Sequence, residues 1–128
     1  MPKRFTLGKS ERLKSRKSLE ELFAQGTRFS AGTLRVVYRH VPGTGELRLG
    51  VGVSSKSFRK AVDRNRVKRL LREAWRVQKN GLQEQIAKQN NDLLVFISYS
   101  GRELPGYKQV FSHTGDVTRK LIENTYTS

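Results

Sequence analysis

Residues 62–80 sort their side chains onto two sides of a helix, and this pattern constrains the fold more than any other in the sequence. Apolar side chains recur at i, i+3, i+4 and i+7, the spacing that buries one helix face against a core. They are Val67, Leu70, Leu71 and Ala74, with Gln78 continuing the row. At 100° per residue, an arc of about 100° on the far side carries polar and basic side chains, namely Asn65, Lys68, Arg69, Arg72, Arg76 and Lys79. The pattern predicts an amphipathic helix with a positive outer face and with Trp75 packed at the edge of the apolar stripe.

Folding alone does not favour this outer face. Lys68 and Arg72 are like charges four residues apart, as are Arg72 and Arg76, and each such pair costs a helix a few tenths of a kcal/mol. Six of the ten basic residues in 56–79 are arginines, whose guanidinium groups suit bidentate phosphate contact. A nearby polyanion would therefore stabilise the face. Glu73 interrupts it, and we expect an exposed ion pair between Glu73 and Arg69.

The charge of the chain is concentrated in two stretches. Its 128 residues include 26 lysines and arginines and 11 acidic residues, a net charge of +15. Residues 1–17 hold seven basic residues and one acid (net +6), and residues 56–79 hold ten and two (net +8). One basic run is compatible with a solvated surface, but two runs beside a neutral remainder indicate phosphate binding. The length predicts a single domain over residues 1–128, with residues 1–15 as a flexible basic lead.

Several classes of site are absent from the sequence. There is no cysteine, which excludes disulfides, cysteine-ligated zinc and thiol nucleophiles. There is no apolar run of 18 residues and no signal-peptide pattern, so we expect a cytoplasmic protein without a membrane partner. His40 and His113 have no motif around them, Asp63 and Glu73 lie among cations, and no phosphate loop is present. We therefore expect no catalytic residue and no metal ligand in the chain, and we infer that any chemistry belongs to a partner.

Outside the basic stretch, the first expected helix spans residues 16–25. Ser18 and Glu21 have the spacing of a capping box, and Gly26 suits a left-handed stop. Leu19, Leu22 and Phe23 follow helical spacing. An aromatic residue on such a helix is usually buried, so the pattern by itself favours a core role for Phe23.

Three apolar segments are expected to be strands. Residues 34–41 and 47–53 flank a Pro-Gly turn and predict a hairpin. The apolar run 93–97 predicts a strand that is covered on both faces, or a central one. In the second strand Gly50 and Gly52 leave one face bare, where a helix, another backbone or a ligand could come close. Near the C-terminus, Val110, Thr114, Val117 and Leu121 predict a final amphipathic helix.

The basic stretch also resembles a known signature. Lys56, Lys60, Ala61 and the run Arg-Asn-Arg-Val-Lys-Arg-Leu-Leu-Arg-Glu-Ala-Trp over residues 64–75 are similar to the signature of the bacterial ribonuclease P protein subunit. Arg12-Leu13-Lys14 before the first helix and residues 49–54 match the family as well, so that the resemblance covers residues 10–122. The chain departs from the family at three positions. Lysine is common at the position of Ser55, and aromatic residues are common at the positions of Leu19 and Val37.

The resemblance implies a fold and a function. The fold is an α+β, two-layer sandwich with a four-stranded, mostly antiparallel sheet, about three helices and a left-handed βαβ crossover, a handedness opposite to the general rule. The function is that of an endoribonuclease subunit that binds a catalytic RNA and promotes hydrolytic removal of the 5′ leader from precursor tRNA. By resemblance the RNA holds the active site, the holoenzyme requires Mg²⁺, and the protein alone binds no cofactor.

The resemblance also assigns residues. Those expected to contact the catalytic RNA, with Arg76 added from the basic arc, are Lys56, Lys60, Arg64, Asn65, Arg66, Lys68, Arg69, Arg72 and Arg76. Those at the positions of the cleft for the precursor's leader are Leu19, Phe23 and Val37. The charge pattern alone leaves two other interpretations open: a non-enzymatic structural RNA-binding protein of the ribosomal kind, and a DNA-organising protein. The Arg-Asn-Arg signature favours the ribonuclease P subunit.

Overall fold

The structure is a computed structural model, and it describes residues 15–127. Its elements in chain order are α1 (Arg16–Gln25), β1 (Thr27–Ala31), β2 (Leu34–Pro42), β3 (Leu47–Val53), α2 (Ala61–Gln78), α3 (Asn80–Ala87), β4 (Asn91–Tyr99) and α4 (Tyr107–Thr127). All the expected helices and strands are present, and β1 and the short α3 are additional. Apart from Ser15, the basic lead over residues 1–15 lies outside the described residues, as do Arg12 and Lys14. No helix in the described part is long and apolar enough to span a membrane.

The sheet has the strand order β1-β2-β4-β3. β1 with β2 and β2 with β4 pair antiparallel, whereas β3 and β4 pair parallel. The mostly antiparallel four-stranded sheet is thus confirmed, but the expected hairpin of β2 with β3 is wrong because β4 lies between these two strands. The sequence neighbours that do pair are β1 and β2, which turn at Gly32 with a φ of 61°. The central place of β4 explains its apolar run, since both of its edges and both of its faces are covered.

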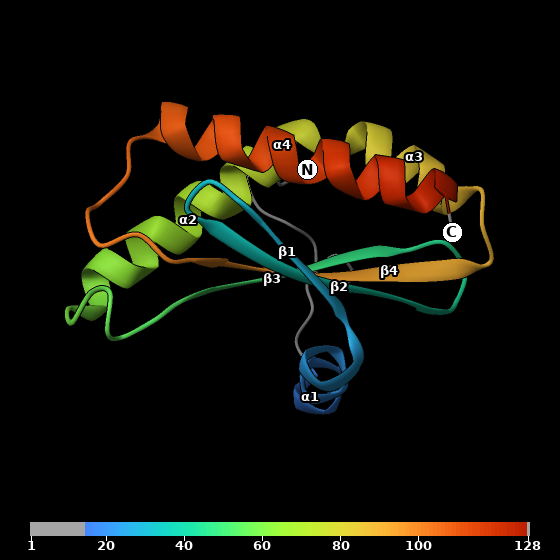
Figure 1. The fold of residues 1–128 in the computed structure, drawn as a ribbon, viewed down its shortest axis with the longest axis horizontal. Helices are drawn as coiled ribbons and strands as arrows, with labels where there is room; N and C mark the ends of the chain where they lie inside the picture. The colour runs from blue at the N-terminus through green and yellow to red at the C-terminus, as the bar shows by residue number, and fades with distance from the viewer. Residues whose placement is uncertain (1–14, 128) are drawn as a thin grey trace, which may run out of the picture.

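The connection from β3 to β4 joins two adjacent parallel strands through α2 and α3. It is the βαβ crossover implied by the family resemblance, and its left-handedness stays a prediction. Figure 1 shows α2, α3 and α4 together on one face of the sheet and α1 alone on the other. The signature helix therefore belongs to the main helical layer, and a large part of the opposite face of the sheet is left to a single short helix.

Most of the core lies between the sheet and the layer formed by α2, α3 and α4. The row Val110, Thr114, Val117 and Leu121 of α4 is buried, as its spacing predicts. Trp75 is 1 % exposed, which confirms its packing role. The other large buried side chains of this cluster include Leu34, Leu71, Leu82, Ile86, Leu93, Val95 and Ile97. The hydrophobic effect of this burial stabilises the position of α2 on the sheet.

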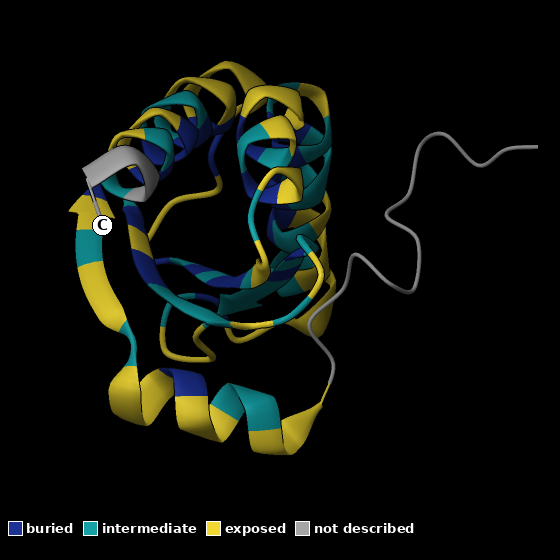
Figure 2. Ribbon diagram, turned by 90° about the vertical axis from the view of Figure 1, so that its right-hand side faces the viewer, coloured by how far each residue is buried: buried dark blue, intermediate teal, exposed yellow. Residues whose placement is uncertain are grey.

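A second, smaller cluster lies under α1. Leu22, Val37 and Leu94 are buried there, and Leu19 and Phe96 pack against them. Figure 2 shows that the rest of α1 is largely exposed. On the bare strand face the Phe96 ring lies against Gly52, since a Cβ at Gly52 would come within 2.7 Å of this ring. The glycine thus makes room for an aromatic side chain of the neighbouring strand.

Both ends of α1 differ from the expected caps. The N-cap is Ser15, whose hydroxyl accepts a hydrogen bond from the Ser18 backbone N–H at 3.3 Å. The helix therefore begins one turn earlier than it would if Ser18 were the N-cap. At the other end Gly26 is extended, with φ −75° and ψ 162°, and its N–H donates to the Leu22 carbonyl. Extended geometry is required here because β1 starts at the next residue.

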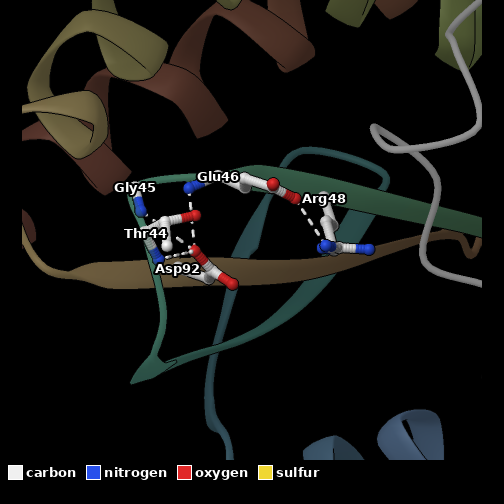
Figure 3. Close-up of polar contacts among 5 residues, drawn as sticks. All are labelled: Thr44, Gly45, Glu46, Arg48 and Asp92. Atoms are coloured by element: carbon white, nitrogen blue, oxygen red, sulfur yellow. Dashed lines mark hydrogen bonds and ion pairs between the residues drawn. The ribbon is translucent and has the colours of Figure 1, made fainter.

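The loop between β2 and β3 is held by one carboxylate at the start of β4. Oδ1 of Asp92 accepts hydrogen bonds from the backbone N–H groups of Thr44, Gly45 and Glu46 at 3.0, 3.1 and 2.8 Å (Figure 3). Glu46 also forms an ion pair with Arg48. Because β4 separates β2 from β3, the loop has to pass the end of β4, and Asp92 fixes it there.

Replacing Asp92 by alanine is expected to lower the free energy of unfolding by about 2 kcal/mol, because three N–H groups lose a charged acceptor. Urea denaturation measures this change. Asp92→Asn is the matched control, because it keeps an oxygen acceptor at the same place without the charge. This variant should lower the free energy of unfolding clearly less than Asp92→Ala does. Equal losses in the two variants would contradict the role of the carboxylate oxygen as acceptor.

His40 on β2 is half-buried, and burial lowers its pKa. Its Nδ1 is buried and has no hydrogen-bond partner among the described residues. As the pH falls below about 6.5, the unfolded chain therefore binds a proton at His40 more readily than the folded chain. The free energy of unfolding should therefore decrease as the pH falls from about 6.5 to the lowered pKa that His40 has in the folded chain. Above about pH 6.5, His40 is neutral in both states and should contribute no pH dependence. Urea denaturation between pH 8 and pH 5.5 tests this, and His40→Leu should flatten the profile.

Candidate nucleic-acid interface

The helix α2 has the two faces that the sequence predicts. Val67, Leu71, Ala74 and Trp75 are buried against the core. We call the opposite side the basic face, and it consists of Asn65, Arg66, Lys68, Arg69, Arg72 and Arg76. Of these, Asn65, Arg66 and Arg69 are exposed, and the others are half-buried. Packing of α2 on the sheet thus leaves most of the predicted RNA-binding residues on one accessible surface.

Two charged groups near the end of α2 differ from the expected arrangement. Glu73 pairs with Arg76, at 2.7 Å between Oε2 and the guanidinium, and the predicted pairing with Arg69 is wrong. This hydrogen bond lowers the pKa of Glu73 and raises that of Arg76. Lys79 lies beyond the end of the helix and is 9 % exposed, with its Nζ donating to Oε1 of Gln83 at 2.7 Å. Lys79 is therefore not part of the basic face.

Arg64 is turned away from the basic face. One nitrogen of its guanidinium donates to the backbone carbonyls of Phe58 and Arg59, at 2.7 and 2.8 Å. Both carbonyls belong to the loop that precedes α2. The expected phosphate contact of Arg64 is untested, but in this geometry the side chain is engaged with its own chain.

The loop over residues 54–60, here called the basic loop, carries the other predicted RNA contacts. Lys56 and Lys60 are exposed, as is Arg59, which the signature did not single out. Phe58 anchors the loop, since it is 7 % exposed and stacks on Tyr99 with ring centroids 6.0 Å apart. The basic loop thus presents three cations beside the start of α2.

A pocket of about 340 Å³ opens beside α1, at the place of the expected leader cleft. Its lining residues are Phe23, Arg28, Phe29, Ser30, Arg35, Val36, Val37, Phe96 and Ser98. The structure thus brings Phe23 and Val37 together, while Leu19 packs in the cluster beneath α1 and does not line the pocket. Two arginines, two serines and several aromatic rings give the pocket donors for phosphate and faces for bases.

Phe23 is not a core residue. Its side chain is 40 % exposed, and its ring meets Phe96 edge to face with centroids 5.0 Å apart. Val37, in contrast, is 4 % exposed and forms part of the floor. The core interpretation that helical spacing favours for Phe23 is therefore wrong, because the ring lines an open pocket instead of a closed core.

The sequence patterns missed Arg28, Arg35 and Phe96 as candidates. Arg35 alternates with apolar neighbours along β2, so its position on the α1 side of the sheet could have been read from the period of two. Arg28 lies on β1, which was not expected, and its guanidinium donates to the Phe23 carbonyl. Phe96 lies within an apolar run that carries no alternation. These residues are assembled by the pairing of β1, β2 and β4.

Acidic and histidine side chains are not gathered into a metal centre in the described part of the chain. No group of three or more of them is placed to hold a metal ion between residues 15 and 127. His113 is instead directed to the β1–β2 turn, with its Nδ1 3.2 Å from the Thr33 hydroxyl. The chemistry that the described surfaces offer is the binding of phosphates and bases.

Comparison with known proteins identifies the family of this chain. The family model described as Ribonuclease P matches residues 7–121. A Porphyromonas gingivalis protein named ribonuclease P protein component is 39 % identical over 114 residues, covering 85 % of this chain and 81 % of the relative. A protein of the same name from Chlorobaculum tepidum is 30 % identical over 129 residues, covering 92 % and 84 %.

The fold has a solved counterpart as well. The structure of the Staphylococcus aureus RNase P protein superposes with a TM-score of 0.65 and 21 % identity, covering 90 % of this chain and 97 % of that one. At 21 % identity this superposition shows a shared fold. The family model and the two relatives show similarity of sequence. Together with the signature on α2, they show that this chain belongs to the ribonuclease P protein family.

Proposed function

We propose that this chain is the protein subunit of a ribonuclease P ribonucleoprotein. The basic face and the basic loop bind the catalytic RNA, and the pocket beside α1 binds the 5′ leader of precursor tRNA. The holoenzyme then hydrolyses the precursor to release the leader and give the mature tRNA 5′ end. We place this activity in the cytoplasm.

The observation that carries the proposal is the presence of two different surfaces on opposite sides of the sheet. α2, with the basic face, lies on one side, and α1, with the pocket, lies on the other (Figure 1). Cationic side chains on a helix supply affinity for phosphates with little sequence information, which suits a structured RNA partner. A pocket with stacking faces and arginines suits a single strand of varied sequence. A subunit that joins a catalytic RNA to a substrate needs both surfaces.

The described residues do not fit a resident Mg²⁺ site. Mg²⁺ prefers oxygen ligands in octahedral geometry, whereas the pocket is lined by two arginines and no carboxylate. The proposal therefore leaves the Mg²⁺ of the holoenzyme with the RNA. The role of this chain is to bind and orient the two RNA molecules.

Reconstitution tests the proposal. A bacterial ribonuclease P RNA, transcribed in vitro, is mixed with precursor tRNA at low Mg²⁺ concentration, with and without the protein, and release of the 5′ leader is followed on a gel. We expect cleavage to require the RNA and to be strongly stimulated by the protein. Cleavage by the protein alone, or no stimulation, would refute the proposal.

The two alternative functions predict other results. A structural RNA-binding protein of the ribosomal kind would copurify with ribosomes, and its depletion would leave precursor processing unchanged. A DNA-organising protein would prefer duplex DNA over structured RNA in direct competition. Neither alternative accounts for a pocket separated from the basic face by the sheet.

A further inference from the structure

The two arginines of the Arg-Asn-Arg motif point in different directions. At 100° per residue, positions 64 and 66 lie about 200° apart around α2. Arg66 is exposed, whereas Arg64 is half-buried and donates two hydrogen bonds to the basic loop. The motif thus combines one outward cation with one that holds its own backbone.

The basic loop is fixed at three points, and Arg64 supplies the last of them. At the start, Ser54 accepts hydrogen bonds from the backbone N–H groups of Lys56 and Ser57, at 3.0 Å each. In the middle, Phe58 is buried against Tyr99. At the end, the Arg64 guanidinium binds the carbonyls of Phe58 and Arg59. Without this last contact, the restraints on Arg59 and Lys60 within residues 15–127 would be the buried Phe58 ring and the start of the helix.

We propose that Arg64 is a positioning residue, which acts on RNA binding through the basic loop rather than by contacting a phosphate. The proposal rests on the function proposed above. Its physical basis is entropic: a loop that is already ordered does not have to be ordered when its three cations, Lys56, Arg59 and Lys60, meet the RNA. The carbonyl oxygens also offset the charge of a guanidinium that lies next to these cations.

The first test is made on the free protein and needs no RNA. Hydrogen exchange should show the backbone amides of residues 56–60 exchanging about tenfold faster in Arg64→Ala than in the wild type. Arg66→Ala is the matched control, since it removes an exposed arginine two residues away that has no hydrogen bond to the loop among the described residues, and it should leave exchange in the loop unchanged. Unchanged exchange in Arg64→Ala would overturn the proposal. Should Arg64→Ala unfold, Arg64→Met retains the apolar stem of the side chain and removes only the donors.

The second test is a double-mutant cycle on RNA affinity, measured by filter binding to the catalytic RNA. We expect Arg64→Ala to weaken binding about tenfold in the wild-type chain but less than about threefold in a chain that already carries Lys56→Ala, Arg59→Ala and Lys60→Ala. Arg66→Ala should weaken binding by the same factor in both chains. An Arg64 effect of equal size in both chains would show a direct phosphate contact and overturn the proposal.

The two experiments distinguish failure of this inference from failure of the proposed function. If the wild-type chain does not bind the catalytic RNA, the proposed function fails, and the exchange experiment still decides whether Arg64 orders the loop. If the wild-type chain binds and the cycle is additive, the proposed function stands and the positioning role of Arg64 is refuted.

Discussion

Replacing Arg66 and Arg69 together by alanine is expected to lower the affinity for the catalytic RNA about 100-fold. Both side chains are exposed on α2. A hydrogen bond to a charged group contributes about 1.5–3 kcal/mol, so the loss of two phosphate contacts amounts to at least two powers of ten. The logarithmic dependence of affinity on salt should become less steep by about two units, because fewer counterions are released.

Filter binding over a series of salt concentrations measures both quantities. The matched control is the double variant Lys88→Ala and Arg119→Ala, which removes the same charge from exposed positions at the C-cap of α3 and on α4, outside the basic face. Its affinity and salt slope should stay close to those of the wild type. If the two double variants behave alike, net charge rather than the basic face determines binding.

Phe23→Ala is expected to reduce the preference for precursor tRNA over mature tRNA by about 5- to 150-fold. Stacking of one base on an aromatic side chain contributes about 1–3 kcal/mol, and mature tRNA has no leader to contribute it. The ring is 40 % exposed, so its removal should change the melting temperature little. Affinities of the reconstituted holoenzyme for the two tRNAs, together with a thermal melt of the free protein, provide the measurement.

Phe111→Ala is the matched control for this prediction. Its ring is 39 % exposed and lies on α4, away from the pocket. The variant removes the same area of aromatic surface and should leave the preference for precursor unchanged. A large drop in melting temperature of Phe23→Ala with its selectivity intact would instead show that Phe23 has a structural role.

The helices and strands that the sequence predicts are those with a strong local period. The apolar row from Val67 to Ala74 and the row from Val110 to Leu121 are both buried as expected. The two elements that the patterns missed are short. β1 is a five-residue edge strand, and α3 has eight residues and follows α2 almost directly. Elements of this length contain only about two repeats of the burial pattern, so that the pattern carries little information about them.

The errors at individual residues concern contacts that helical spacing does not specify. The pairing of Glu73 with Arg76 rather than Arg69 depends on rotamers that spacing does not specify. Phe23 is exposed because it lines the open pocket beside α1, and Arg64 faces inward because the basic loop folds back onto the first turn of α2. In each case the residue type and its position on the helix were known, but the group that it contacts was not.

The sequence by itself determined the basic face, its location on one helix, and the family, because helical periodicity and a contiguous signature depend only on residues close together in the chain. Tertiary structure alone decided that β4 separates β2 from β3, which brings Phe96 and Arg35 beside Phe23 in one pocket. Strand order is a choice among distant pairings, and it is settled by burial of the apolar β4 in the centre of the sheet rather than by any local preference.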